Sequence, residues 1–437
     1  MELIQTLGKL KPHISCSLTT ASQQYQLQYC EDRKDTAVDI LSNAEGKGAA
    51  IKTFALRGRV VDGNRDWAFG TILVEGSTIK NVEPGSINAD ETIDLPADSI
   101  LMPGFIDLQV NGAFGVDVAT EPERLEKLSI ELLKTGTTCY LPTLISLPLT
   151  DYPTLLPQIS LGGGRGAIPL GLHLEGPFLH PEKRGAHPLS NIEPPSEGAL
   201  EAMLGATSIR MITLAPEKEH AQELIDLAVS QGTLVSAGHS DASFVAANRA
   251  FDHGVTAVTH LFNAMRPLLS REPGLPGAAL TYGPPVACGI IADGRHIHPN
   301  VVKLAFQALG PEYLYLITDS ISAAGMGAGK YSLAGQVVSL EGGDAPRLGE
   351  RPPAGSLENR PLAGSILTMN QALRNVMAFT GCSLGEAVRM ATSTPAPLIG
   401  EEAARGRLVP GHRADIVALS PDLEVRKVWI GGEKRLG

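Results

Sequence analysis

Eight short apolar runs alternate with longer amphipathic stretches through the middle of the chain, and this repeat constrains the fold more than any other feature. The runs span residues 104–110, 137–143, 169–175, 209–215, 234–239, 257–262, 287–293 and 314–319. Apolar runs that alternate with helical patterns are typical of β/α units with a parallel sheet. Eight units predict an α/β fold with a (β/α)8 barrel of the TIM type. An open doubly wound sheet is the alternative, but no Gly-x-Gly-x-x-Gly turn follows the first run to support it.

Both ends of the chain have a different pattern, in which short strand-like segments are separated by glycine turns. We therefore predict one small β-sandwich domain assembled from the two ends. Its predicted boundaries are 53–100 and 398–437, with the barrel over 101–397 and an N-terminal extension over 1–52. The extension lacks clear periodicity, and we expect it to lie outside the core and to be partly disordered. A targeting role is the alternative, but the acidic residues of this segment argue against a transit peptide.

The composition excludes several classes of function. The formal net charge of −11 disfavours broad binding to nucleic acid or to an anionic membrane. No uninterrupted apolar run reaches the roughly 18 residues that a membrane span requires. The five cysteines are scattered without a Cys-x-x-Cys pair, and the N-terminus has no long apolar core, so we expect reduced thiols and a cytoplasmic protein. A small anionic substrate remains compatible with the charge if a local cluster of cations binds it.

Residues that bind metals or transfer protons stand at the ends of several predicted strands. Glu175 closes the third strand, His239 the fifth and His260 the sixth; Asp293 follows the seventh and Asp319 closes the eighth. The carboxyl ends of barrel strands meet at one rim, where active sites form. Each histidine by itself could be a buried core residue, but packing does not require this clustering. The pattern therefore favours a functional site.

One glutamate and two histidines are the three protein ligands of a catalytic zinc-like centre, with a position left for water. We predict one divalent ion on Glu175, His239 and His260. Zinc fits this set best, and iron, cobalt and manganese would also bind it. Asp319 would transfer protons beside the water, with a structural ion pair or turn as its alternative role.

The first strand carries amides where other barrel hydrolases carry metal ligands. Gln109 and Asn111 alternate on one face, at the place of the His-x-His pair of two-metal barrels. Amides are poor ligands for borderline-soft metals, so this is at most a vestigial second-metal position. His173 shares a face with Glu175 but lies deeper in its strand, and we interpret it as a core histidine or a support for the ligands.

A linked set of motifs identifies a family resemblance. In order, the chain contains PGFIDLQVNG, HLEGPFL, KRGAH, LAPE, AGHS, THLFNAM, REPG, GIIADGRH, TDS, LAGS and GRLVPGHRADIVAL. This series resembles that of the N-acetylglucosamine-6-phosphate deacetylases of the amidohydrolase superfamily, from about Phe54 to the end. The resemblance implies a barrel with a small β-sandwich, the metal ligands named above and Asp319 as acid and base. It implies that His187 contacts the acetamide carbonyl. The full set of implied substrate-binding residues is Ala186, His187, Asn263, Ala264, Arg271, Asp293, Gly294, Arg295, His296, Leu362, Ala363 and Gly364.

The implied activity is metal-dependent hydrolysis of N-acetyl-D-glucosamine 6-phosphate to D-glucosamine 6-phosphate and acetate, in amino-sugar catabolism or recycling. The alternatives are the galactosamine epimer, another amidohydrolase substrate such as a cyclic amide, and a catalytically silent barrel scaffold. The scaffold is disfavoured because the three ligand positions and the acid/base position are all filled. Arg271 lies on a loop well past its strand, so we expect a homodimer in which Arg271 and His296 contribute to the neighbouring site.

A Gly/Pro-rich segment follows Asp319, and two helical stretches follow it. We interpret the segment as a lid or substrate loop, with disorder without function as the alternative.

Overall fold

The computed structural model describes residues 52–162, 164–342, 344–350 and 360–437. Apart from Lys52, the predicted N-terminal extension lies outside these residues. Within them, eight parallel strands form a nearly closed barrel, which confirms the predicted fold class. The barrel strands are β6 (Phe105–Val110), β9 (Thr137–Ile145), β11 (Leu172–Glu175), β12 (Ile209–Leu214), β13 (Leu234–Ala237), β14 (Ala257–Val258), β15 (Ala287–Ile290) and β16 (Leu314–Leu316).

Each barrel strand pairs in parallel with its neighbour. The short strand β10 (Ile168–Pro169) also pairs with β9, and Leu170 and Gly171 separate it from β11. The barrel closes between the end of β6 and the residues that follow β16, where the backbone N–H of Asp319 donates to the carbonyl of Gln109 over 2.9 Å. Closure therefore joins the first and last strands at the rim that carries the predicted site.

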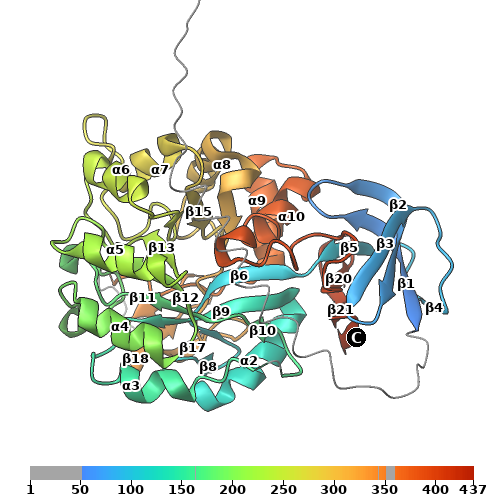
Figure 1. Ribbon diagram of the computed structural model, residues 1–437, viewed down its shortest axis with the longest axis horizontal. Coiled ribbons are helices and arrows are strands. Elements are labelled where there is room, and N and C mark those ends of the chain that lie inside the picture. The colour runs from blue at the N-terminus through green and yellow to red at the C-terminus, as the bar shows by residue number, and fades with distance from the viewer. Residues whose placement is uncertain (1–51, 163, 343, 351–359) are drawn as a thin grey trace, which may run out of the picture. The chain divides into compact units, whose positions relative to one another are not determined.

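Helices surround the barrel strands (Figure 1). They are α2 (Leu125–Leu132), α3 (Tyr152–Leu155), α4 (Glu197–Ala206), α5 (Ala221–Ser230), α6 (Phe244–Asp252), α7 (Gly274–Tyr282), α8 (Pro299–Tyr313), α9 (Met369–Thr380) and α10 (Leu384–Ala391). The short 3₁₀ helices are η1 (Pro122–Arg124), η2 (Leu133–Thr135), η3 (Leu156–Gln158), η4 (Pro181–Lys183), η5 (Leu189–Asn191) and η6 (Pro397–Ile399). None of the described helices combines the length and apolar character needed to cross a membrane.

Helix α10 illustrates how the local sequence sets these elements. Ser383 and Glu386 form a capping box, in which each side chain binds a backbone N–H of the first turn. The residues that α10 buries include Leu384, Ala387, Val388 and Ala391, the spacing of one helix face. Both predicted helices after the Gly/Pro-rich segment, α9 and α10, are present.

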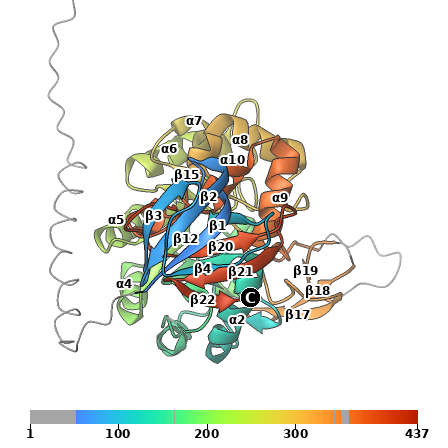
Figure 2. The same ribbon diagram turned by 90° about the vertical axis from the view of Figure 1, so that its right-hand side faces the viewer.

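A second sheet combines strands from the two ends of the chain (Figure 2). Its strands are β1 (Thr53–Val61), β2 (Asp66–Glu75), β3 (Thr78–Pro84), β4 (Glu91–Ile93), β5 (Ile100–Pro103), β20 (Ile416–Leu419), β21 (Val425–Ile430) and β22 (Glu433–Leu436). The two ends meet where β5 pairs antiparallel with β20. Alternate residues face opposite sides: Leu101 and Ile416 belong to a small core of this sheet, while Met102 and Val417 belong to the large core of the barrel. A separate sheet domain is therefore present, and its exact boundaries stay predictions.

The segment after Asp319 contains a small antiparallel sheet of β17 (Gly329–Leu333), β18 (Gln336–Leu340) and β19 (Arg347–Leu348). Ala334 and Gly335 form the turn between β17 and β18, and both have positive φ (48° and 78°), as two-residue hairpin turns of this kind require. A further short hairpin, β7 (Gly112–Ala113) and β8 (Val116–Asp117), follows β6. The described part of the segment therefore forms regular strands, and its role as a lid stays a prediction.

Candidate active site

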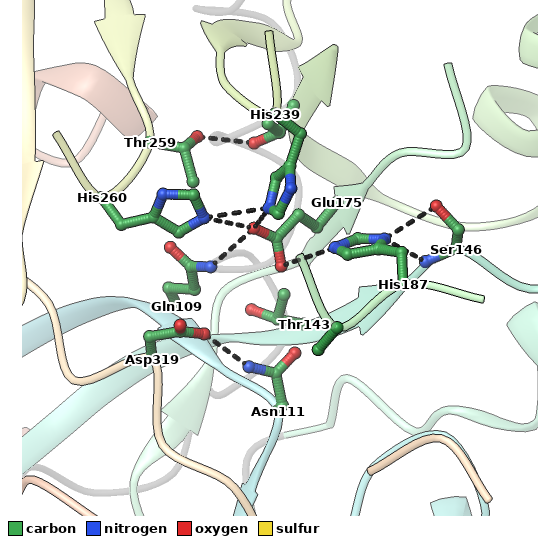
Figure 3. A network of polar contacts seen from close by, with 12 residues as sticks. Gln109, Asn111, Thr143, Ser146, Glu175, His187, His239, Thr259, His260 and Asp319 are labelled. Carbon is green, nitrogen blue, oxygen red and sulfur yellow. Dashed lines mark hydrogen bonds and ion pairs between the residues drawn. The ribbon is translucent and has the colours of Figure 1, made fainter. Parts of the chain in front are cut away.

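Four side chains meet at the rim of the barrel (Figure 3). Glu175 ends β11, His239 and His260 follow β13 and β14, and His187 lies in the loop after β11. Glu175 Oε1 lies 3.0 Å from His239 Nε2 and 2.9 Å from His260 Nε2, and these two nitrogens are 3.0 Å apart. His187 Nε2 lies 3.8 Å from Glu175 Oε2. Donor atoms of Glu175, His187 and His239 all fall within 4.8 Å of one another, as a metal site requires. All four residues are buried, so their polar atoms converge on one desolvated point.

The backbone is strained where these strands end. His239, His260 and Asp319 have φ values of 49°, 30° and 48°, a left-handed region that residues other than glycine rarely adopt. Such conformations cost free energy and persist where the surrounding structure imposes them, most often at functional sites. The strain therefore marks the same three strand ends as the sequence pattern.

The hydrogen bonds of the imidazoles assign different chemistry to His239 and His187. His239 Nδ1 lies 2.8 Å from the carbonyl oxygen of Lys183. A carbonyl only accepts, so Nδ1 carries the proton and Nε2 has a free lone pair. At His187 the backbone N–H of Ser146 donates to Nδ1 over 3.1 Å, so the proton of the neutral ring is on Nε2. His239 Nε2 therefore carries a free lone pair, and His187 Nε2 carries a proton.

The charges in the cluster follow from burial and from these contacts. Burial raises the pKa of Glu175, but contacts with His187, His239 and His260 outweigh it and hold the pKa well below its ordinary value. Burial lowers the pKa of His187 to about 4. The cluster therefore contains an ionised carboxylate and a neutral imidazole donor near neutral pH.

Asp319 lines the same pocket as the cluster. Burial and the charge of Glu175 raise the pKa of Asp319 to about 8, although Asn111 Nδ2 donates to its Oδ1 over 2.7 Å. A cation at the cluster would lower this pKa. A carboxyl group whose pKa lies near the working pH can both accept and release a proton.

Gln109 and Asn111 both direct their amide N–H groups at carboxylates. Gln109 Nε2 donates to Glu175 Oε1 over 3.0 Å, as Asn111 does to Asp319. Gln109 Oε1 and Asn111 Oδ1 are buried and have no hydrogen-bond partner among the described residues. The two amides therefore restrain the acidic groups, and their assignment as a vestigial second-metal position stays a prediction.

The cluster opens into a pocket of about 270 Å³, a size that suits a small molecule. Of the predicted substrate-binding residues, those that line it are Ala186, Asn263, Ala264, His296, Leu362 and Gly364. The pocket is also lined by residues that no sequence motif predicts, namely Ile145, Gly185, Ile291, Leu333 and Pro361. They are apolar or lack a side chain, so no chemical signal in the sequence distinguishes them from core or loop residues.

Other predicted residues stand outside the lining, and His187, beside Glu175, is one of them. Asp293 Oδ2 accepts from His296 Nδ1 over 2.7 Å, and its pKa is lowered because the contact with His296 outweighs burial. Asp293 therefore holds His296 rather than facing the pocket. Ala363 is fully buried, and Gly294 belongs to the turn between Asp293 and His296. Arg271 and Arg295 are exposed.

Gly364 allows its segment to approach Asp319 closely. The backbone N–H of Ser365 donates to the carbonyl of Asp319 over 2.8 Å. Gly364 has φ 59°, and a Cβ there would lie 2.9 Å from the carbonyl oxygen of Asp319. A side chain at this position would push the segment away from the end of the eighth strand.

A barrel with a carboxylate and imidazoles converging at its carboxyl rim is the arrangement of metal-dependent hydrolases. The chain belongs to the amidohydrolase family, whose sequence model matches residues 100–435.

Its relatives include the N-acetylglucosamine-6-phosphate deacetylase of Bos taurus, 40% identical over 359 residues that cover 79% of this chain and 85% of that protein. The N-acetylgalactosamine-6-phosphate deacetylase of Escherichia coli is 37% identical over 340 residues, 76% of this chain and 87% of that protein. One similar solved structure is that of a mutant N-acetyl-D-glucosamine-6-phosphate deacetylase from Mycobacterium smegmatis, in complex with N-acetyl-D-glucosamine-6-phosphate. It matches with a TM-score of 0.79 at 31% identity, and the match covers 88% of this chain and 100% of that one. These matches confirm the resemblance seen in the motifs.

Proposed function

We propose that the protein hydrolyses N-acetyl-D-glucosamine 6-phosphate to D-glucosamine 6-phosphate and acetate, with one divalent metal ion. The observation that carries this proposal is the convergence of Glu175, His239 and His260 beside Asp319 in one small pocket. The substrate is supported by the bovine and mycobacterial relatives, which carry this activity in their names.

Glu175, His239 and His260 are the ligands in this proposal. An ionised carboxylate and a free Nε2 lone pair on His239 fit a divalent cation, and His260 Nε2 lies next to both. His187 is left out of the set because its Nε2 carries the proton. Zinc fits these donors best, while iron, cobalt and manganese also bind such sites. When bound, the ion supplies a Lewis acid that acidifies water and polarises the amide carbonyl.

Asp319 is the proposed general base and acid. It accepts a proton from the attacking water and then donates it to the sugar nitrogen, because an amine leaves readily only when protonated. Asn111 restrains Asp319 Oδ1, which leaves Oδ2 for proton transfer.

His187 is the proposed donor to the acetamide carbonyl oxygen. The backbone N–H of Ser146 donates to Nδ1 of His187, and this keeps the ring proton on Nε2. A donor directed at the carbonyl oxygen stabilises the negative charge that develops on it. Asp293 similarly fixes His296 through Nδ1, which leaves Nε2 of His296 for the sugar phosphate beside Asn263.

We propose a homodimer in which Arg271 contributes to the substrate site of the neighbouring subunit. Arg271 is exposed, as are nearby Leu268 (46%) and Leu269 (55%), and an interface that covers these leucines would gain apolar burial. His296 lines the pocket of its own chain, so the contribution to the neighbouring site is proposed for Arg271. Analytical ultracentrifugation tests the dimer, and a rise in KM for Arg271→Ala in the dimeric protein tests the shared site.

The deciding experiment measures acetate release from N-acetylglucosamine 6-phosphate by the purified, metal-replete protein. The galactosamine epimer is the second candidate substrate because the Escherichia coli relative is named for it. A kcat/KM for the glucosamine compound well above that for its epimer supports the proposal, and the reverse order selects the second candidate.

We also propose a cytoplasmic location. Cys139, Cys288 and Cys382 are buried free thiols, as is usual in a reducing compartment.

A further inference from the structure

The pocket has two chemically different ends. Asn263 and His296, which follow β14 and β15, provide polar groups at one end. Ile145 at the end of β9 and Leu333 at the end of β17 provide an apolar wall. In the strand order of the barrel, β9 is next to β11, whereas β14 and β15 lie three and four strands beyond β11. The apolar wall therefore faces the polar end across the mouth of the barrel.

Ile145 is placed next to the reacting groups by the strand register. It is the pairing partner of Glu175 in the parallel sheet, and paired residues of neighbouring strands point to the same face. The next residue, Ser146, donates its backbone N–H to His187 Nδ1. Ile145 thus lies next to the carboxylate that we assign to the metal, and it precedes the residue that fixes the donor that we assign to the carbonyl.

The small sheet of β17–β19 holds Leu333 beside Ile145 at the pocket. Gln336 Nε2, across the turn from Leu333, donates to the carbonyl of Ala186 over 2.9 Å. Ile145, Leu333 and Ala363 belong to one buried apolar cluster, and Ala186 packs against it. Ile145 and Leu333 are each only 3% exposed. Other side chains therefore pack closely against them on every side except the one that faces the pocket.

We infer that Ile145 and Leu333 form the binding site for the acyl group and limit its length to acetyl, an inference that rests on the proposed function. With the carbonyl oxygen at His187 and the sugar phosphate toward Asn263 and His296, the substituent on the carbonyl carbon must face the apolar wall. A methyl group fills a site of this kind, and a longer chain has to displace packed side chains. One methylene changes discrimination in a hydrophobic pocket by roughly 10- to 200-fold.

The test compares kcat/KM for N-acetylglucosamine 6-phosphate and N-propionylglucosamine 6-phosphate. The unaltered protein is expected to prefer the acetyl compound by at least about tenfold. Leu333→Ala and Ile145→Val are each expected to raise the propionyl-to-acetyl ratio, by about tenfold for the larger truncation. Ile145→Val removes a single methyl group, so the result does not depend on whether the larger truncation folds. Ile291→Val, at the other end of the same pocket, is the matched control and is expected to leave the ratio unchanged.

An unchanged ratio in both wall variants, or an equal rise in the Ile291→Val control, would overturn the acyl site while leaving the deacetylase activity intact. A different result separates the two proposals: if the unaltered protein does not hydrolyse the acetyl compound at all, the proposed function fails and the acyl site fails with it.

Discussion

The barrel contains buried histidines at two levels, and they differ in what satisfies their nitrogens. Inside the barrel, His173 Nε2 lies 2.7 Å from Thr213 Oγ1 and His173 Nδ1 lies 3.2 Å from the carbonyl oxygen of Leu108. At the rim, His239 and His260 direct Nε2 at each other and at Glu175, and His260 Nδ1 has no partner among the described residues. Both ring nitrogens of the interior histidine have hydrogen-bond partners that are neutral protein groups, whereas the rim histidines converge on a carboxylate.

This difference separates a structural histidine from a proposed ligand more clearly than burial does. All three side chains are buried, and His173 stands only two residues before Glu175 on the same strand. Burial lowers the pKa of His173 to about 4, so it is a neutral group in a hydroxyl network that continues from Thr213 to Thr259. The comparison predicts that the rim controls chemistry and the interior controls stability.

Metal removal should have the largest effect on turnover, and it should affect only the residues at the rim. A chelator is expected to abolish turnover, and added zinc to restore it, because the proposed ion acidifies the water. Far-UV circular dichroism should stay unchanged, since the interior is held by protein groups alone. Full activity in protein that elemental analysis shows to be metal-free would refute the assignment of the rim.

Asp319→Asn should lower kcat by about 10²- to 10⁴-fold, because the amide cannot accept the proton. Steady-state kinetics measures the loss, and the metal content should stay that of the unaltered protein. Asp422→Asn, at an exposed carboxylate in the sheet domain, is the matched control and should leave kcat unchanged. Undiminished turnover in Asp319→Asn would remove Asp319 from its role.

His187→Gln tests whether the rim itself divides into ligands and a donor. It should lower kcat by about 10²- to 10³-fold and retain the metal, because Nε2 of His187 donates rather than ligates. His239→Gln should lose the metal, as elemental analysis would show. If His187→Gln loses the metal and His239→Gln keeps it, the assignment drawn from the tautomers is wrong.

His173→Asn tests the interior. Loss of the imidazole should lower the free energy of unfolding by about 1–3 kcal/mol, because it removes the buried hydrogen-bond partner of the Leu108 carbonyl and one of the two partners of the Thr213 hydroxyl. Urea denaturation measures this change, and kcat should change far less than in His187→Gln. A loss of kcat as large as that of His187→Gln, with unchanged stability, would contradict the division between rim and interior.

The smallest expected effect is a pH dependence of stability from Asp107, a buried carboxyl group that accepts hydrogen bonds from the backbone and hydroxyl of Thr318. Burial raises the pKa of Asp107 from 3.8 to about 7, although these bonds oppose it. The folded state therefore binds this proton more tightly than the unfolded chain. The resulting stabilisation is complete below the unfolded pKa and is lost as the pH rises through about 7.

The free energy of unfolding should thus fall less between about pH 5 and about pH 8 in Asp107→Asn than in the unaltered protein. Urea denaturation at the two pH values checks this, and an equal or steeper fall in the variant would show that Asp107 does not titrate in this range.

The sequence was enough to predict the barrel, the sheet domain from both ends and the strand-end position of the acidic and imidazole groups. These features are local: apolar runs predict buried strands, and the polar residue that ends a run falls at the rim of a parallel barrel. The motifs added the family and a set of substrate-binding residues. Half of that set lines the pocket, whereas Asp293 lies behind His296 and Arg271 is exposed.

Only the tertiary structure decided what each rim residue can do. The backbone of Ser146 and the carbonyl of Lys183 set the protons of His187 and His239, and neither group has a signature in the sequence. In the sequence, Ile145 and Leu333 cannot be distinguished from core residues. The strand register beside Glu175 and the small sheet place them at the pocket. The physical reason is that proton positions and pocket shape depend on contacts between residues far apart in the chain, whereas strands and their polar ends depend on near neighbours.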